Sequence, residues 1–212
     1  MNSRPDFIKN NKKKVCLICE GFEEYDYLSR LIELKLWSDV YDFTLINAES
    51  NGNISARYQD KYQSDSYDIV LVLCDTDRKP HHDFEMIRSK INRIFGKEDA
   101  ADEVLIFVNP CTMQVELLHF DDVRLRTQNK SRNASEIKRI TGIENYKARE
   151  DQRQAICTMI SKENDEEMKK RLDSLPTDYT IESSTNFSRF LARFESDDDS
   201  WIDEVNEKLD SE

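Results

Sequence analysis

Acidic side chains follow two short apolar runs of this chain, at the point where each run ends. Glu20 and Glu24 follow the first run, and Asp75 and Asp77 follow the second. Hard divalent cations prefer oxygen ligands and keep several waters, so two or three carboxylates are enough to bind one. We therefore expect Glu20, Asp75 and Asp77 to hold Mg²⁺ or Mn²⁺, with Glu24 as a further ligand or in the layer behind.

The spacing within each motif supports this interpretation. Asp75 and Asp77 are two residues apart, so both side chains point the same way if the strand geometry continues through Thr76. Gly21 permits a tight turn and the close approach of a phosphate to the backbone. The alternative is that such an Asp-x-Asp is a surface or helix-capping feature. The second acidic motif at another strand end favours the metal site.

The elements that position these residues alternate between strands and helices. Apolar and β-branched runs predict strands, and apolar residues at helical spacing predict helices between them. Gly96 stands where the third helix is expected to stop. Crossovers of this length predict a parallel sheet with its ligand site at the carboxyl ends of the strands. The predicted strands are 15–19, 43–46, 69–74 and 104–108, and the predicted helices are 23–37, 54–63 and 83–95.

The character of the chain changes after residue 120. Charge density rises, strand-like runs disappear, and the remaining apolar residues recur at helical intervals. We therefore expect an α/β domain over residues 1–120 and a helical extension over 121–212 that packs on it. Residues 196–212 are expected to form either a loosely held acidic helix or a disordered tail.

Composition limits the cellular setting. The chain has 212 residues and no apolar stretch of membrane-spanning length, and its N-terminus is polar and basic, so we expect a cytoplasmic protein without membrane contact. Its five cysteines suit free thiols in a reducing compartment. Cys16 and Cys19 could be read as a redox or zinc Cys-x-x-Cys, but on a strand their side chains diverge, which favours two core cysteines.

Charge is unevenly distributed along the chain. The net charge is −12, of which the segment 195–212 contributes −8 from nine acidic residues and one lysine, leaving −4 for the rest. Nine lysines and arginines lie between residues 124 and 153, and the N-terminal arm holds more. These cations could contact the phosphates of DNA or RNA, or could be ordinary solvated faces. An acidic tail could also mask a basic groove.

Three motifs also resemble a known family. The glutamate motif at 18–24 and the Asp-x-Asp at 74–77 resemble the motifs of TOPRIM domains. Their order, the pair His81 and His82, and the run 109–120 are similar to the RloB-like proteins, a TOPRIM-related group associated with restriction and abortive-infection loci. The resemblance covers about residues 14–120.

The resemblance implies a TOPRIM-like (Rossmann-like) central parallel sheet with helices on both faces, and Mg²⁺-dependent hydrolysis of phosphodiesters. Asp75 and Asp77 would bind the ion, and Glu20 would complete the coordination or act as general acid and base. Lys79, or Arg78 beside it, would stabilise charge on the phosphate oxygens.

The third motif departs from the family. An aromatic residue and a glutamate follow Asn-Pro-Cys there, whereas this chain has Thr112 and Met113. Either Glu116, one helical turn later, substitutes for the missing glutamate, or the active site is altered or weakened. His119 matches the histidine of the motif, although a histidine after an apolar run also suits a structural role.

Three functions follow from these interpretations. The leading one is a nuclease or nucleic-acid processing enzyme of anti-phage defence that acts with a partner ATPase. Whether the chain also forms a homodimer stays open. The second is a non-catalytic binding or sensor subunit of a defence complex. The third, a nucleotide-sugar transferase, leaves the Glu20 motif unexplained. The chain is too small for a topoisomerase and lacks the zinc module of a primase.

Overall fold

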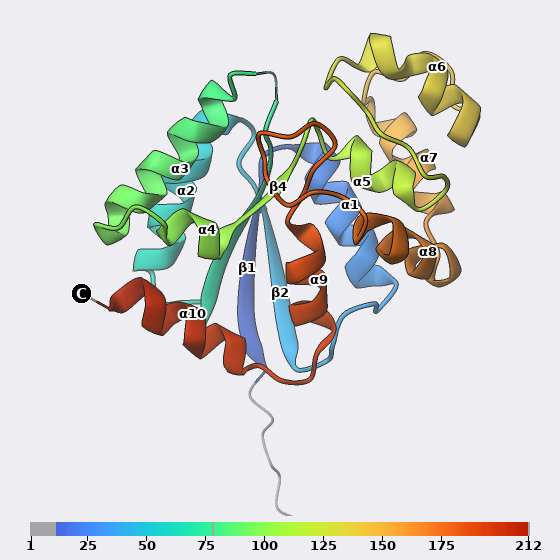
Figure 1. The fold of residues 1–212 in the computed structure, drawn as a ribbon. Coiled ribbons are helices and arrows are strands. Elements are labelled where there is room, and N and C mark those ends of the chain that lie inside the picture. The colour runs from blue at the N-terminus through green and yellow to red at the C-terminus, as the bar shows by residue number, and fades with distance from the viewer. Residues whose placement is uncertain (1–11, 78, 212) are drawn as a thin grey trace, which may run out of the picture.

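Four parallel strands form one sheet in the computed structural model, which describes residues 12–77 and 79–211 (Figure 1). The strands are β1 (Lys13–Cys19), β2 (Tyr41–Asn47), β3 (Ile69–Asp75) and β4 (Leu105–Val108), and their order across the sheet is β2-β1-β3-β4. The predicted α/β class with a parallel sheet is confirmed, and the arrangement is consistent with a Rossmann-like fold. All four predicted strands are present, with β2 beginning two residues earlier than expected.

Helices cover both faces of this sheet. On one face, α2 (Asn51–Gln63) contacts β1 and β3, and α3 (His82–Phe95) packs on α2. On the other face lie α1 (Phe22–Glu33) and α9 (Phe187–Glu195) (Figure 1). The remaining helices are α4 (Ala100–Val104), α5 (Met113–Leu118), α6 (Lys130–Thr141), α7 (Glu150–Met159), α8 (Lys162–Leu172) and α10 (Ser200–Asp210).

The strand order creates a switch point between β1 and β3. The chain leaves β1 toward β2 through α1, then returns across β1 to β3 through α2, so the two helices fall on opposite faces. In open parallel sheets the crevice between such strands, at their carboxyl ends, is the usual ligand site. Here β1 ends at Cys19 and β3 ends at Asp75, so both acidic motifs reach this crevice.

The C-terminal part is integrated into the sheet layer. Asn186 hydrogen-bonds both the Phe107 amide and the Leu105 carbonyl of β4, and Val108 forms an antiparallel bridge with Thr185. The buried apolar residues of both halves form one continuous core. Residues 121–212 are therefore joined to the α/β part by one core, and the boundary at residue 120 stays a prediction.

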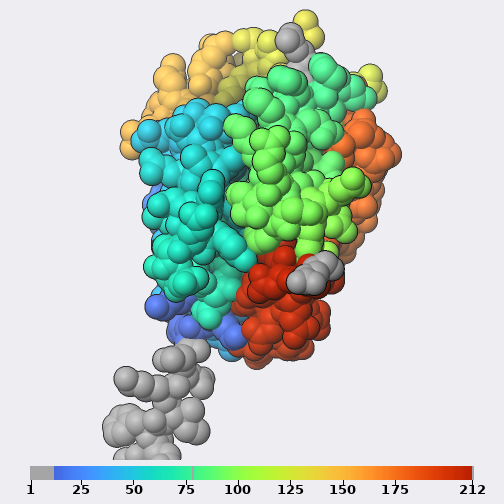
Figure 2. Space-filling view, turned by 90° about the vertical axis from the view of Figure 1, so that its left-hand side faces the viewer, coloured from blue at the N-terminus to red at the C-terminus, as the bar shows by residue number. Residues whose placement is uncertain are grey.

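The acidic C-terminal segment forms a helix with a buried face. Of the two expected forms of this segment, the structure has the helix, as α10. Trp201, Ile202, Val205 and Leu209 of α10 are buried. Figure 2 shows α10 in red below α4, on the side that α2, α3 and α4 cover.

Other sequence expectations concern cysteines and membrane segments. All five cysteines are buried and unpaired, and Cys16 and Cys19 belong to the core, as the strand argument predicts. Burial raises the pKa of Cys16 to about 12, so this thiol stays protonated. Among the helices of the described residues, none has the length and apolar character needed to cross a membrane. Arg4, Lys9 and most of the basic N-terminal arm lie outside the described residues.

Candidate active site at the carboxyl ends of β1 and β3

Glu20 and Asp75 meet at the switch point. The Glu20 carboxylate Oε2 accepts a hydrogen bond from the Asp75 backbone N–H at 3.1 Å, so the ends of β1 and β3 are joined through a catalytic candidate. The side chain of Asp75 turns toward the loop after β4. Its Oδ1 accepts from both the backbone N–H and the hydroxyl of Thr112, at 2.7 and 2.9 Å. Thr112, where the resembled family has an aromatic residue, therefore orients Asp75.

Glu24 lies behind these two carboxyl groups. It is the third residue of α1 and only 4% exposed, and its Oε2 accepts from the Gly21 N–H at 2.8 Å. This contact is the half of a capping box that the N3 glutamate supplies, since Gly21 at the N-cap has no side chain to supply the other half. Gly21 has an extended φ of −149°, and a Cβ there would lie 3.5 Å from Glu24 Oε2. The chain passes from β1 to α1 through the two residues Glu20 and Gly21 without a left-handed φ at the glycine, and the Gly21 backbone N–H positions Glu24.

The carboxyl groups of this cluster raise one another's pKa. Burial, then the charges of Glu24 and Asp77, raises the pKa of Glu20 to about 8. Burial also raises the pKa of Asp75 well above its ordinary value, with the charges of Glu24 and Glu20 adding to the effect. Burial raises the pKa of Glu24 as well. Each of these carboxyl groups therefore holds its proton more tightly than it would in water. A cation bound among them would lower their pKa values again.

Asp77 is placed differently from the sequence expectation. The strand geometry ends at Asp75, and Asp77 has a left-handed φ of +55°. Its Oδ2 accepts from the Asn51 side chain of α2 at 3.2 Å. The prediction that Asp75 and Asp77 point the same way along a continued strand was therefore wrong, because the backbone turns between them. The charge of Asp77 still contributes to the raised pKa of Glu20.

The four carboxyl groups fit a divalent ion by their chemistry but not by their present arrangement. Glu20, Glu24, Asp75 and Asp77 offer oxygen atoms alone, which suits Mg²⁺, and their mutual repulsion favours a cation among them. Within residues 12–77 and 79–211, however, no group of three or more acidic, histidine or cysteine side chains has the arrangement of a metal site. Glu20 is directed at the Asp75 amide, so a shared ion requires its carboxylate to turn.

An ion pair beside the cluster, between Lys130 and Glu23, was not predicted from the sequence. Lys130, the first residue of α6, pairs with Glu23. The Glu23 carboxylate also accepts from the Tyr146 hydroxyl at 2.8 Å. Burial lowers the pKa of Lys130, but the charges of Glu23 and Asp75 outweigh it and the pKa is raised, so Lys130 is a fixed cation next to the site. The sequence signal for Glu23 was its place between Glu20 and Glu24, whereas nothing near Lys130 distinguished it from other lysines.

Glu116, the expected substitute for the missing motif glutamate, is buried in α5. It is 2% exposed, and its Oε2 has no partner among the described residues. Burial, then the charges of Glu23 and Glu24, raises its pKa well above the ordinary value. The charges that most affect Asp75 are those of Glu24, Glu20 and Glu23. The charges that act most on Glu116 are thus those of the two α1 residues Glu23 and Glu24.

His119 lies in the core between α1 and α8. The Tyr27 hydroxyl donates to its Nε2 at 3.1 Å, and its Nδ1 donates to the Asn164 side-chain oxygen at 3.3 Å. Burial lowers its pKa to about 3, so the ring is neutral at physiological pH. Both nitrogens are engaged and the residue is 2% exposed, which places His119 in a structural rather than a catalytic role.

The basic candidate Lys79 lies in the loop between β3 and α3. It is exposed and lines a cleft of about 350 Å³ together with Asp77 and His81. His82 is exposed, and Arg78 lies outside the described residues. Of the predicted site residues, the structure thus brings together Glu20, Glu24 and Asp75, sets Asp77 and Lys79 at the adjoining cleft, and leaves Glu116 and His119 buried.

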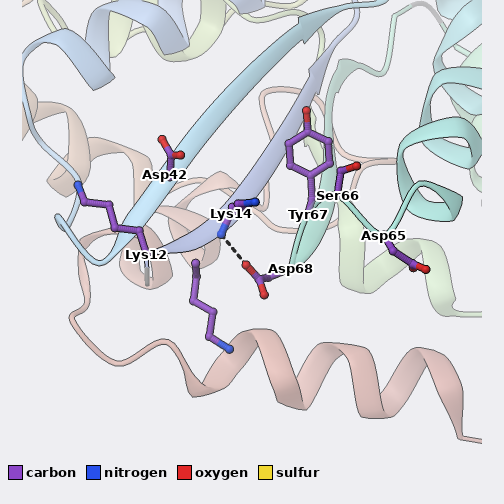
Figure 3. A pocket seen from close by; sticks show the side chains of 8 residues that line it. Lys12, Lys14, Asp42, Asp65, Ser66, Tyr67 and Asp68 are labelled. Carbon is purple, nitrogen blue, oxygen red and sulfur yellow. Dashed lines mark hydrogen bonds between the residues drawn. The ribbon is translucent and has the colours of Figure 1, made fainter. Parts of the chain in front are cut away.

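A larger cleft lies at the opposite end of the sheet. Its volume is about 640 Å³, and its lining includes Lys12, Lys14, Asp42 and Asp68 near the amino ends of the strands (Figure 3). The Asp68 carboxylate accepts from the Lys14 backbone N–H at 2.7 Å, the contact drawn in Figure 3. Ligands of parallel sheets bind at the carboxyl ends, so this cleft is not the candidate site.

The chain was compared with protein families, curated proteins and solved structures. No protein-family model, no curated protein and no solved structure matches the chain.

Proposed function

We propose that this chain is a metal-dependent phosphodiester hydrolase that acts on nucleic acid through a TOPRIM-like carboxylate site. The observation that carries the proposal is the meeting of Glu20 and Asp75 at the switch point of a parallel sheet. Buried carboxyl groups that repel one another there gain from a divalent cation, and carboxylates with Mg²⁺ are the usual equipment for phosphoryl chemistry.

The residues of the chain have distinct parts in this proposal. Glu20, Asp75 and Asp77 would hold Mg²⁺ or Mn²⁺, which when bound neutralises phosphate charge and lowers the pKa of water. In the alternative arrangement Glu20 stays off the ion, and its pKa of about 8 without a bound cation then lets it carry a proton at neutral pH and deliver it to a leaving oxygen. Lys79 at the cleft and Lys130 beside Asp75 supply positive charge for the substrate's phosphate.

The setting of this activity rests on the sequence resemblance. The RloB-like motifs support a cytoplasmic role in anti-phage defence, in association with a partner ATPase. In that setting a nuclease acts on foreign or host nucleic acid.

The experiment is a cleavage assay on labelled DNA and RNA with and without Mg²⁺. We expect cleavage that requires the metal and that falls at least about 100-fold in Asp75→Asn, since this change removes a charged ligand at nearly constant shape. Glu207→Gln, an exposed carboxyl change on α10, is the control and should keep full activity. Metal-independent cleavage, or full activity in Asp75→Asn, contradicts the proposal.

A second candidate is a non-catalytic binding or sensor subunit. Two observations favour it: the described residues contain no metal-type grouping, and Met113 stands where the resembled family has a glutamate. Calorimetry with Mg²⁺ discriminates between the two functions. The absence of metal binding at millimolar concentration, together with tight association of a partner protein, supports the sensor.

A further inference from the structure

The cleft beside the carboxylates combines two segments that lie far apart in the sequence. Lys79 and His81 come from the loop between β3 and α3, whereas Arg126 and Arg132 come from the start of α6 and the segment before it. Two carboxyl groups, Asp77 and Glu182, also line the cleft, so cations outnumber anions by three to two. This excess stands out in a chain whose net charge is −12.

The three cations of the cleft are available to a ligand. Lys79, Arg126 and Arg132 are exposed, and none of their side chains forms an ion pair with another described residue. The amino end of α6, a helix of 12 residues, lies at the same place, because its N-cap Asn129 and Arg132 both line the cleft. The amino end of a helix attracts anions through its partial positive charge.

His81 provides an independent sign of a ligand. It is 5% exposed, and its Nδ1 donates to the Thr76 carbonyl at 2.9 Å, which fixes the ring. Its Nε2 is buried and has no partner in the described part of the chain. Because Nδ1 carries the proton in this contact, Nε2 is an acceptor. A buried acceptor without a partner is costly, and a donor group of a ligand in the cleft, such as a hydroxyl, would satisfy it.

The cleft is linked to the carboxylate cluster through Asp77, two residues after Asp75 in the chain. Asp77 lines the cleft and also acts electrostatically on Glu20. We infer that the cleft formed by Lys79, His81, Arg126 and Arg132 binds a backbone phosphate of a polynucleotide, next to the one that reaches Glu20 and Asp75. This inference rests on the proposed function, because it takes the substrate to be a nucleic acid whose backbone crosses from the cleft to the carboxylates.

The test measures binding of fluorescein-labelled single-stranded RNA and DNA by anisotropy, in EDTA so that no cleavage occurs, over a range of salt concentrations. The variant combines Lys79→Ala, Arg126→Ala and Arg132→Ala. We expect affinity to fall about tenfold or more and the slope of log K against log salt to shrink by about 0.7, since the cleft neutralises one phosphate and each neutralised phosphate accounts for about 0.7 on single strands. His81→Asn, which suits a left-handed position, should weaken binding without changing this slope.

The matched control removes three other exposed cations, with Arg57→Ala, Lys90→Ala and Arg93→Ala on α2 and α3. It should leave the slope unchanged. Equal losses in the two triple variants, no oligonucleotide binding by the wild type, or equally tight binding of a nucleoside monophosphate would overturn the inference. Cleft-dependent binding without cleavage in Mg²⁺ would refute the proposed function alone, and cleavage without cleft dependence would refute this inference alone.

Discussion

Glu20 and Asp75 meet at one point but are held by different partners. Glu20 accepts a single bond from the Asp75 amide, whereas Asp75 accepts two from Thr112. Hydrogen bonds to the charged form of an acid oppose the effect of burial on its pKa. Of the two, Glu20 is the side chain that can turn toward a ligand with the loss of one hydrogen bond.

The raised pKa of Glu20 makes stability depend on pH. Its pKa is about 8 in the folded chain and about 4.5 when unfolded, so only the folded state holds the proton between these values. The free energy of unfolding should therefore fall as pH rises from about 4.5 to 8. We expect Glu20→Gln to be more stable than the wild type at pH 8 in EDTA by about 1–3 kcal/mol, after allowance for solvent screening. Urea denaturation at pH 5 and pH 8 measures this.

Glu207→Gln, at an exposed carboxyl of α10, serves as the control for that experiment and should follow the wild-type curve. A Glu20→Gln variant with the same pH dependence as the wild type would show that Glu20 ionises normally.

Protons and a divalent ion should compete for the carboxylate cluster. Binding of the ion to the folded state alone raises stability, and the bound ligands must be deprotonated. We expect 10-fold more Mg²⁺ to raise the free energy of unfolding by about 1.4 kcal/mol near saturation at pH 8, and by less at pH 6. Thermal unfolding across a Mg²⁺ series measures this. Asp75→Asn should lose the stabilisation, and an equal effect in that variant would place the ion elsewhere.

The bonds of His119 lead to a prediction about the core. His119→Phe leaves the buried Tyr27 hydroxyl without its partner, at a cost of about 1–3 kcal/mol, whereas the Asn164 oxygen keeps its bond from the Ser161 N–H. The loss should be greatest at pH 7. The pKa of His119 is about 3 when folded, so the stability that this residue contributes disappears as pH falls from about 6.5 toward 3. Denaturation at pH 7 and pH 5 tests this, with the exposed His82→Ala as control.

At the scale of elements, the sequence predicted the strands better than the turns after them. Continuous apolar runs identified β1 and β3 because both strands are buried on both faces. The direction of Asp77 was predicted wrongly because a strand pattern does not say where the strand stops, and the chain turns at a left-handed residue. Thr112 and Lys130 could not be predicted, since their roles depend on α5 and α6 reaching the sheet edge.

The outer edge of the edge strand β4 is covered by the segment around Asn186, which bonds it through a side chain. Asn186 bonds one amide and one carbonyl of β4, at 2.9 and 2.8 Å. Asn186→Ala leaves both backbone groups unpaired and should destabilise the fold by about 2 kcal/mol. The control is Asn206→Ala. Asn206 donates an exposed hydrogen bond to the Asp68 carbonyl, and its loss should lower the free energy of unfolding by less than about 0.5 kcal/mol. Equal midpoints in urea for the two variants would show that the β4 contact contributes nothing.

For the whole molecule, the location of α10 decides what the acidic segment can do. Its Asp203 pairs with Lys13 at the start of β1, and its Asn206 bonds Asp68 just before β3. The helix therefore lies at the amino ends of the strands, opposite Glu20 and Asp75. The apolar face of α10 anchors it at this far end, where Asp203 meets Lys13 of the basic N-terminal arm, so the masking of a basic groove by the acidic segment stays a prediction.

Because one core runs through both halves of the chain, α10 should unfold together with the sheet. Trp201 is 7% exposed, and its Nε1 donates to the Tyr41 hydroxyl of β2 at 2.8 Å. We expect Trp201→Ala to destabilise the whole chain by about 3–5 kcal/mol, as large core truncations do. Trp37 packs against Phe194 and Phe43, so its fluorescence reports the sheet in this variant. Fluorescence and far-UV circular dichroism should give one coincident transition.

Ile181→Ala, at a side chain that is 47% exposed, is the control. Two separate transitions would mean that residues 121–212 fold apart from the sheet, as the predicted boundary at residue 120 would allow.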